Sequence, residues 1–382
     1  MIEVKENGFI ELEQFKAVKK ERPVNEKYPR RKTRVLNVGG VPMGGNSPIS
    51  VQTMTKTKTH DIKATVDQIH RVAEVGADIV RVTVNTLEAA EAIAEIVKQT
   101  KTPIVADIHF NYTFALKSIL GGVAGVRINP GNIGKRERIE KVLRAAKERG
   151  IPIRIGVNSG SLEKDILEKH GYPTDEALFE SAMRHVEIAH DCGFEDIAVS
   201  VKSTSVPLMI SAYRLIAERT DIPLHLGVTE AGTQRVGTIK SAIGIGTLLA
   251  EGIGDTIRVS LTDEPEKEIE VGKEILRSLG LSQRNVEIIS CPTCGRLDVD
   301  LFSIVNQLEE RTKHIRKPVK VSILGCAVNG PGEAADADIG IAASKGKGLL
   351  FRKGIAIRHV LEADIVDELY KEIMEFVPEE FN

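Results

Sequence analysis

The chain has 382 residues, which is too long for one small domain and suits two compact ones. Hydrophobic residues make up 42% and charged residues 28%, with a formal net charge of −2, so nothing indicates a nucleic-acid or membrane partner. No signal-peptide core and no apolar run of 18 residues occurs in the sequence. We therefore expect a cytoplasmic protein, whose cysteines stay reduced and serve metal or redox chemistry.

The N-terminal part of the chain divides into a tail and a predicted hairpin. Residues 1–32 are polar and mixed in charge, and we interpret them as a tail outside the folded domains. The following segment, from Val35 to Gly45, combines short apolar runs with two glycine pairs. This pattern predicts a hairpin, which could plug the floor of the domain that follows.

Short apolar runs alternate with longer amphipathic segments over residues 33–280. The runs predict strands at Ile49–Met54, Ile79–Val84, Ile104–Ile108, Gly125–Ile128, Ile153–Val157, Ile197–Val201, Leu224–Val228 and Thr256–Leu261. Helices are predicted between most of them, at Asp61–Val75, Leu87–Lys98, Lys135–Arg149, Thr174–His190 and Glu264–Leu279. Eight strand–helix repeats favour a (β/α)8 TIM-type barrel. A doubly wound open sheet is the alternative, but no GxGxxG motif follows the first strand.

A second, smaller α+β domain is predicted at residues 284–382, after a linker at Gly280–Gln283. Its predicted order is a strand at Val286–Ser290, a helix at Val299–His314, strands at Val319–Leu324, Ile339–Ala342, Gly348–Phe351 and Ile355–Val360, and a helix at Asp364–Phe376.

Polar residues recur on one face of the predicted barrel strands. Because side chains alternate along a strand, residues two apart share a face, and this face points into the barrel. The residues concerned are Gln52, Met54, Arg81, Asp107, His109, Arg127, Asn129, Arg154, Asn158, Ser200, Lys202, His225, Thr229, Arg258 and Ser260.

Four arginines and one lysine in this set cannot stay charged inside a barrel without anions. Asp107, and Glu230 if it lies near the rim, could neutralise two of them at most. Since the arginine guanidinium matches phosphate oxygens in pairs, the excess predicts a diphosphate ligand. The alternative is that these cations form a salt-bridged layer or reach solvent past the rim.

Three cysteines in the second domain predict a metal centre. Cys291 and Cys294 form a CxxC turn, and Cys326 lies in a glycine-rich loop that also carries Glu333. The remaining cysteine, Cys192, fits a small buried apolar position. The fourth ligand is therefore a non-cysteine group such as Glu333, or the position is open, which suits an iron–sulfur cluster. The alternative is a structural zinc site completed by His314 or His359.

Several motifs together resemble the 4-hydroxy-3-methylbut-2-enyl diphosphate synthase family in its two-domain bacterial form. The motifs are Arg127-Ile-Asn-Pro-Gly-Asn-Ile-Gly, Arg154-Ile-Gly-Val-Asn158-Ser-Gly-Ser, His225-Leu-Gly-Val-Thr-Glu230-Ala-Gly, Arg258-Val-Ser-Leu-Thr, Cys291-Pro-Thr-Cys294-Gly and Cys326-Ala-Val-Asn-Gly-Pro-Gly-Glu333-Ala. The resemblance covers about Thr33 to Glu375, and no motif position departs from it.

The resemblance implies an iron–sulfur oxidoreductase of the non-mevalonate isoprenoid pathway. It would open and dehydroxylate 2-C-methyl-D-erythritol 2,4-cyclodiphosphate by two single-electron transfers, giving 4-hydroxy-3-methylbut-2-enyl diphosphate. The implied [4Fe–4S] cluster ligands are Cys291, Cys294, Cys326 and Glu333, and the implied catalytic residues are Glu230, Glu333 and Asp107. The implied substrate-binding residues are Arg81, Arg127, Arg154, Asn158, Lys202, Arg258, Ser260, His109 and His225.

The resemblance also implies partners. A ferredoxin or flavodoxin would deliver the electrons, and two chains would form a homodimer in which the cluster domain of one caps the barrel of the other. Two other readings stay open from the residues alone. Lys202 could form a Schiff base in an aldolase-type, phosphate-binding barrel with a structural zinc site. The chain could also be a non-enzymatic iron or redox sensor, although that would leave the cationic barrel interior unexplained.

Overall fold

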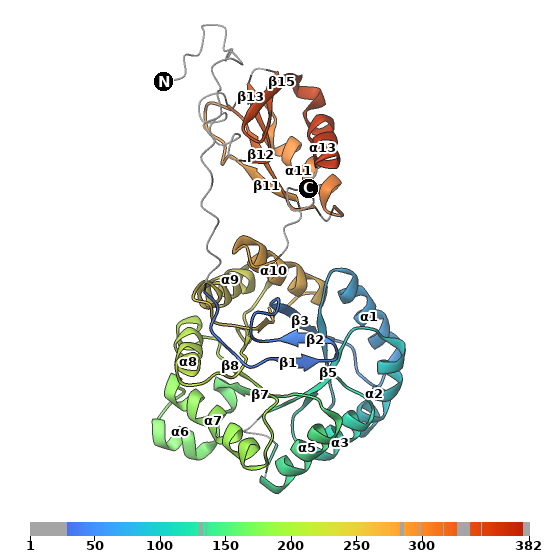
Figure 1. The fold of residues 1–382 in the computed structure, drawn as a ribbon, viewed down its shortest axis with the longest axis vertical. Helices are drawn as coiled ribbons and strands as arrows, with labels where there is room; N and C mark the ends of the chain where they lie inside the picture. Colours follow the sequence, from blue (N-terminus) through green and yellow to red (C-terminus); the bar gives the residue numbers. More distant parts are fainter. Residues whose placement is uncertain are drawn as a thin grey trace. The chain divides into compact units, whose positions relative to one another are not determined.

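The computed structural model describes residues 29–129, 133–134, 136–282, 286–297, 299–315, 317–326, 337–344 and 346–376. The chain divides into two compact units between Ser282 and Gln283 (Figure 1). Across the described ranges, no helix is both long and apolar enough to span a membrane.

Eight parallel strands form the barrel of the first unit. They are β3 (Ser50–Met54), β4 (Ile79–Thr83), β5 (Ile104–Ile108), β6 (Gly125–Ile128), β7 (Ile153–Asn158), β8 (Ile197–Lys202), β9 (His225–Leu226) and β10 (Thr256–Ile257). Their order in the sheet is β8-β7-β6-β5-β4-β3-β10-β9. A parallel bridge from Val199 to Leu224 joins β8 to the residue before β9, which nearly closes the ring. The predicted TIM-type barrel is thereby confirmed.

The last two barrel strands are shorter than predicted. The apolar runs predicted strands to Val228 and Leu261, but β9 ends at Leu226 and β10 at Ile257. Gly227 directly follows β9, and a Cβ there would lie 2.6 Å from the Arg258 carbonyl oxygen and 2.7 Å from the Lys202 Nζ, so a larger residue does not fit without a shift. Gly227 therefore leaves room for the Lys202 side chain of β8 and for the backbone at Arg258.

Helices surround the strands and bury their apolar faces against them (Figure 1). The described ones are α1 (Ile62–Glu74), α2 (Leu87–Gln99), α3 (Tyr112–Leu120), α5 (Arg136–Arg149), α6 (Lys164–His170), α7 (Asp175–Asp191), α8 (Val206–Arg219), α9 (Gln234–Ala250) and α10 (Pro265–Ser278), with a short 3-10 helix η2 (Ser159–Ser161). The side chains of Asp61, Thr86 and Thr174 cap α1, α2 and α7 by accepting a backbone N–H. The five predicted helices of this unit are present, each within two residues of its predicted ends.

The predicted hairpin is present and covers the barrel floor. Strands β1 (Leu36–Val38) and β2 (Val41–Met43) pair antiparallel. They pack on Ile79, Val105 and Ala198, which lie at the starts of their strands and hence at the N-terminal end of the barrel. The end of the predicted tail also binds the barrel, since Arg30 Nη2 lies 3.0 Å from Asp255 Oδ1. Residues 1–28 of the tail lie outside the described residues.

The second unit is a five-stranded mixed sheet with helices on one face. The strands lie side by side in chain order: β11 (Val286–Ser290), β12 (Val319–Leu324), β13 (Ile339–Ser344), β14 (Lys347–Arg352) and β15 (Ile355–Leu361). The first three are parallel to one another, whereas β14 runs antiparallel to both of its neighbours, β13 and β15. The helices are α11 (Leu301–Thr312), the 3-10 helix η3 (Glu362–Asp364) and α13 (Ile365–Glu375). Leu308 of α11 and Leu369 of α13 pack on Val321 and Ile341 of the sheet. This order is the one that the sequence predicted.

Candidate active site

The predicted polar face of the strands lies inside the barrel. Pairing register brings its members together, with Asp107 opposite Arg127, Arg127 opposite Arg154, and Asn158 opposite Lys202. The buried members include Arg81, Asp107, Arg127, Arg154, Ser200, Lys202 and His225, whereas the Arg258 side chain is 15% exposed.

Asp107 is the centre of an ion-pair cluster. Its two carboxylate oxygens lie 3.1 Å from Arg127 Nη1 and 3.5 Å from Arg81 Nε, and His109 Nε2 lies 3.9 Å away. Burial alone would raise the pKa of Asp107, but Arg81 and Arg127 together hold it well below its usual value. Asp107 is therefore ionised at neutral pH and holds two arginines in fixed directions.

A glycine makes room for one of these arginines. Arg127 Nη2 donates a hydrogen bond to the Gly156 carbonyl oxygen at 2.8 Å. A Cβ on Gly156 would lie 2.4 Å from Arg127 Nε, so no other residue fits there without moving the guanidinium. The glycine of the Arg-Ile-Gly-Val-Asn motif thus serves an arginine on the neighbouring strand.

Cations outnumber anions inside the barrel. Arg81, Arg127, Arg154, Lys202 and Arg258 are five basic side chains, and the described carboxylates at ion-pair distance from them are Asp107 and Glu268, an excess of three basic groups. Burial, followed by the field of Arg258 and Arg154, lowers the pKa of Lys202 well below its usual value. A multiply charged anion would relieve this repulsion.

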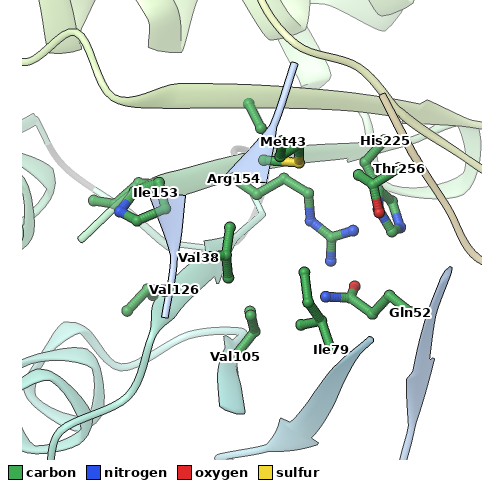
Figure 2. Close-up of a pocket in the computed structure, with 13 residues that line it drawn as sticks. Val38, Met43, Gln52, Ile79, Val105, Val126, Ile153, Arg154, His225 and Thr256 are labelled. Carbon is green, nitrogen blue, oxygen red and sulfur yellow. The ribbon is translucent and has the colours of Figure 1, made fainter. Parts of the chain in front are cut away.

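Arg154 is a buried cation of the barrel without hydrogen-bond partners among the described residues. All three nitrogens of its guanidinium are buried and lack a hydrogen-bond partner within the described ranges, as do Gln52 Oε1 and His225 Nε2. Figure 2 shows the guanidinium among Gln52, Thr256 and His225, beside a small cavity of about 30 Å³ above the hairpin. Polar groups this deeply buried are normally paired, so this layer requires water or a ligand.

A larger pocket of about 300 Å³ opens at the barrel mouth. Its lining includes Met54, Lys56, Glu230, Gly232, Arg258, Ser260, Thr262 and Glu268. Glu230 follows β9 with a φ of 50°, a left-handed backbone that non-glycine residues seldom adopt. An acid, an arginine and a hydroxyl group from neighbouring loops therefore share one cavity at the end where barrel enzymes carry their active sites.

Glu268 is a functional candidate that the sequence analysis missed. It lies on α10 and is only 3% exposed, and it faces Arg258 across 3.9 Å. A signal was present, because Glu268 interrupts the otherwise apolar buried stripe of α10, which includes Ile269 and Ile275. A charge on such a stripe indicates a polar partner in the interior.

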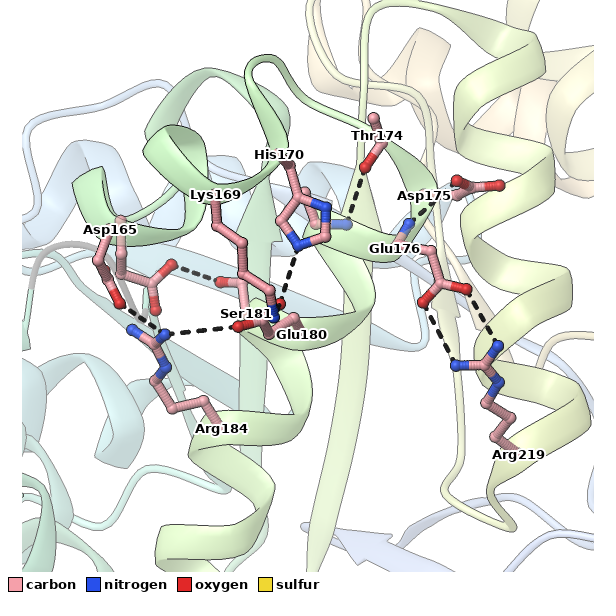
Figure 3. Close-up of polar contacts among 12 residues, drawn as sticks. Asp165, Lys169, His170, Thr174, Asp175, Glu176, Glu180, Ser181, Arg184 and Arg219 are labelled. Carbon is pink, nitrogen blue, oxygen red and sulfur yellow. Dashed lines mark hydrogen bonds and ion pairs between the residues drawn. The ribbon is translucent and has the colours of Figure 1, made fainter.

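Ion pairs and hydrogen bonds join the two helices that follow β7, α6 and α7 (Figure 3). The segment after Asn158 includes α6, whose His170 Nε2 lies 2.8 Å from Glu180 Oε2. Arg184 Nη2 binds Asp165 at 2.7 Å. These contacts tie α6 to α7 and so anchor the loop that follows Asn158, one of the predicted substrate ligands.

The cysteine loops leave the same edge of the C-terminal sheet. Cys291 directly follows β11, and Cys326 follows β12, its parallel neighbour, after one glycine. A Cβ on that glycine, Gly325, would lie 2.2 Å from Leu297 of the CxxC loop, so the two loops approach closely. Cys291 and Cys326 are partly buried, whereas Cys294 is exposed, and all three are free thiols.

Arg296 adds a positive charge to this edge. Its Nε donates to Cys294 Sγ at 3.4 Å, and this hydrogen bond lowers the pKa of Cys294. Cys294 in turn raises the pKa of Arg296, with a smaller contribution from Cys326 on the adjacent loop. A thiol biased toward thiolate at Cys294, together with Cys291 on the same loop and Cys326 on the adjacent one, fits a metal or iron–sulfur group. No three His, Cys, Asp or Glu side chains gather as a metal site within the described ranges, and Glu333 lies outside them.

Neither candidate zinc ligand lies at the cysteine edge. His314 precedes β12, whereas Cys326 follows it, so the two lie toward opposite ends of that strand. His359 is on β15, three strands from β12, which is about 14 Å at the usual strand spacing. Cys192, predicted as a small buried residue, packs partly buried against the barrel core at the end of α7.

Comparison with known proteins identifies the family. A model of the GcpE TIM-barrel domain matches residues 33–273, and one of the GcpE protein C-terminal domain matches residues 287–375. A protein of Geobacillus thermodenitrificans is 55% identical over 358 residues, covering 94% of this chain and 96% of the relative. A protein of Caldanaerobacter subterraneus subsp. tengcongensis is 56% identical over 92% of this chain and 99% of its own. A third, from Clostridium perfringens, is 57% identical over 90% and 98%.

All three relatives are named 4-hydroxy-3-methylbut-2-en-1-yl diphosphate synthase (flavodoxin). The two family models match in the order of the two structural units and together cover most of the chain. The resemblance found in the motifs is confirmed, and this chain belongs to the GcpE family.

Proposed function

We propose that this protein is a 4-hydroxy-3-methylbut-2-enyl diphosphate synthase, an iron–sulfur oxidoreductase of isoprenoid biosynthesis. The observation that carries the proposal is membership of the GcpE family over both units, with relatives of this name at 55–57% identity. The reaction takes up two electrons and two protons, opens the ring of 2-C-methyl-D-erythritol 2,4-cyclodiphosphate and releases one water. The aldolase alternative on Lys202 is not favoured by this membership.

The barrel, residues 33–280, binds the substrate at its mouth. The three excess basic groups support this role, because a cyclic diphosphate brings at least two negative charges, which favour the protonated form of each. Its phosphates bind to Arg81, Arg127, Arg154, Lys202 and Arg258, with Asn158, Ser260, His109 and His225 as polar neighbours. Asp107 acts by orienting Arg81 and Arg127, and the substrate carbons face Glu230 at the mouth pocket.

The C-terminal domain, residues 284–382, holds a [4Fe–4S] cluster through Cys291, Cys294, Cys326 and Glu333. When bound, such a cluster supplies electrons one at a time. Glu333 offers a carboxylate oxygen, which binds iron more labilely than a thiolate does. Glu230 donates a proton to the departing hydroxyl group, and its exposed position at the mouth lets solvent restore that proton.

The electrons come from a small redox protein. A flavodoxin is the donor in the names of the relatives, and a ferredoxin is the second candidate. We place the enzyme in the cytoplasm as a homodimer, which size-exclusion chromatography with light scattering would test by mass.

Iron, acid-labile sulfide and zinc content tests the cluster in protein purified without oxygen. About four irons and four sulfides per chain are expected. One zinc without sulfide would contradict the proposal and return attention to Lys202, where borohydride trapping of a substrate adduct would detect a Schiff base.

Glu333→Ala tests the fourth ligand. The variant should retain iron and sulfide while reductive turnover of the cyclic diphosphate collapses. Glu309→Ala, an exposed carboxylate on α11, is the matched control and should keep full activity. Full activity in Glu333→Ala would remove Glu333 from the mechanism.

A further inference from the structure

Glu268 is a buried carboxylate beside the mouth pocket, with three separate partners. Its Oε1 accepts the backbone N–H of Leu261 at 3.0 Å, and its Oε2 accepts the Thr53 hydroxyl at 2.7 Å. The same Oε2 lies 3.9 Å from Arg258 Nη2. An isolated buried carboxylate would be very unfavourable, so these partners explain how a charge can stay there.

The carboxylate spans the seam between the first and last strands of the barrel. The ladder between β10 and β3 consists of Thr256 opposite Ser50 and Ile257 opposite Val51. Beyond Ile257 the chain continues as the loop that carries Arg258 and Ser260 into the pocket. Glu268 ties this loop to Thr53 of β3, and so takes over where the ladder ends.

Arg258 is left with hydrogen-bonding capacity that points to a ligand. Glu268 lies against one end of the guanidinium, while Arg258 Nε is buried and has no partner among the described residues. The side chain is 15% exposed and lines the pocket of about 300 Å³ that Glu230 and Ser260 also line. A guanidinium held at one edge presents its other N–H groups in a fixed direction.

We propose that Glu268 is a positioning residue, which aims the Arg258 guanidinium at a phosphate group in the mouth pocket. The inference rests on the proposed function, because it takes a diphosphate as the ligand of that pocket. Glu268 acts in two ways: it fixes the Arg258 loop through Leu261, and it fixes the guanidinium through the ion pair.

A simple electrostatic effect would have the opposite sign. If Glu268 were only a negative charge near the ligand, its removal would strengthen the binding of an anion, because the pocket would gain net positive charge. If Glu268 positions Arg258, its removal weakens binding, and only while Arg258 is present. The sign of the change and its dependence on Arg258 therefore separate the two roles.

A double-mutant cycle tests the inference on the full-length protein with its cluster. The affinity for 2-C-methyl-D-erythritol 2,4-cyclodiphosphate is measured by calorimetry without reductant, so that no turnover occurs, for wild type, Glu268→Gln, Arg258→Gln and the double variant. We expect Glu268→Gln to weaken binding about tenfold in wild type and less than about twofold beside Arg258→Gln. In steady-state assays KM should rise while kcat stays nearly constant, whereas a purely structural defect would lower kcat through the active fraction.

Glu270→Gln is the matched control. It removes an exposed carboxylate from the same helix, one that pairs with Lys267 and does not line the mouth pocket, so affinity should change less than about twofold. If Glu268→Gln does not fold, Glu268→Asp replaces it in the same cycle, since it keeps the charge but shortens the reach to Leu261.

Each outcome has a distinct meaning. If Glu268→Gln lowers the affinity equally with Arg258 and with Arg258→Gln, or if it tightens binding, the positioning role is overturned while the proposed function stays intact. No binding of the cyclic diphosphate by the wild-type protein would overturn both.

Discussion

The barrel interior and the cysteine edge of the C-terminal sheet position their functional groups in different ways. In the barrel, Asp107, Arg127 and Arg154 lie on neighbouring strands, each opposite the next in the ladder. At the cysteine edge, Cys291 and Cys326 lie partly buried in loops just beyond the strands, and Cys294 is exposed. A ladder places charges before any ligand arrives, whereas loop thiols depend on the group they bind to complete their order.

The comparison implies that the two functions can be lost separately. Substitutions in the barrel should change the affinity for the ligand and leave the iron content unchanged. Substitutions of the cysteines should lower the iron content and leave the affinity nearly unchanged.

Cys326→Ser should abolish turnover by removing a cluster ligand. Iron and sulfide content should fall sharply, while the affinity for the cyclic diphosphate changes less than about twofold. Cys192→Ser is the control, because Cys192 lies at the end of α7 in the barrel unit and should leave the iron content unchanged. A Cys326→Ser protein with its full iron content would show that Cys326 is not a ligand.

Arg127→Ala should weaken binding of the cyclic diphosphate by roughly 30-fold or more, because it removes a phosphate ligand and disturbs the Arg81–Asp107 pair. It should also lower the free energy of unfolding by about 3–5 kcal/mol, since Asp107 loses its closest partner. The visible spectrum of the cluster should not change. Calorimetry and urea unfolding measure the two losses.

Arg144→Ala provides the comparison for Arg127→Ala. Arg144 is exposed on α5, so its replacement removes an arginine without touching the barrel interior. Unchanged affinity in Arg127→Ala would exclude that residue from the diphosphate site.

His225→Gln should flatten the pH dependence of stability. Burial, with Arg154 and Lys202 nearby, lowers the pKa of His225 well below its usual value, so the folded protein keeps this imidazole neutral. Histidine in the unfolded chain binds a proton below about pH 6.5. The free energy of unfolding therefore decreases as the pH is lowered below this value, by up to about 1.4 kcal/mol per pH unit. Urea unfolding at pH 7, 6 and 5 should show a smaller decrease in the variant.

Asp107 contributes to the pH dependence of stability in a different pH range, so it does not obscure this test. Its pKa is lowered in the folded state, so its stabilisation is present above about pH 4 and is lost only at lower pH. An identical slope in wild type and His225→Gln between pH 7 and 5 would contradict the buried neutral imidazole. His70→Gln, on the exposed side of α1, controls for the loss of a surface histidine.

Asp300→Ala should have the smallest effect, a loss of about 1 kcal/mol confined to the C-terminal unit. Asp300 caps α11 by accepting the Ser303 N–H at 3.1 Å. Hydrogen exchange should become faster in α11 and stay unchanged in α2. Thr86→Ala, which removes the cap of α2 in the barrel, should give the reverse pattern. Faster exchange in both helices from either substitution would mean that the two units unfold together.

Local patterns predicted much of the fold because they depend on neighbours in the chain. The alternation of Val80, Arg81 and Val82 already implied which side of β4 faces the barrel interior, and the structure buries all three as expected. The predicted ends of β9 and β10 were wrong, because the apolar residues Val228 and Leu261 look like strand residues in the sequence but lie beyond the strands in the structure. In the structure β9 ends just before Gly227 and β10 just before Arg258, two residues whose backbones approach each other closely.

The sequence by itself determined the barrel, its polar inner face and the three thiols, since periodicity and motif spacing are properties of the chain alone. Only the tertiary structure decided that Glu268 faces Arg258 across the β3–β10 seam and that Gly156 makes room for Arg127. These pairs join residues on different elements. Their distances depend on strand register and helix packing, which no local pattern contains.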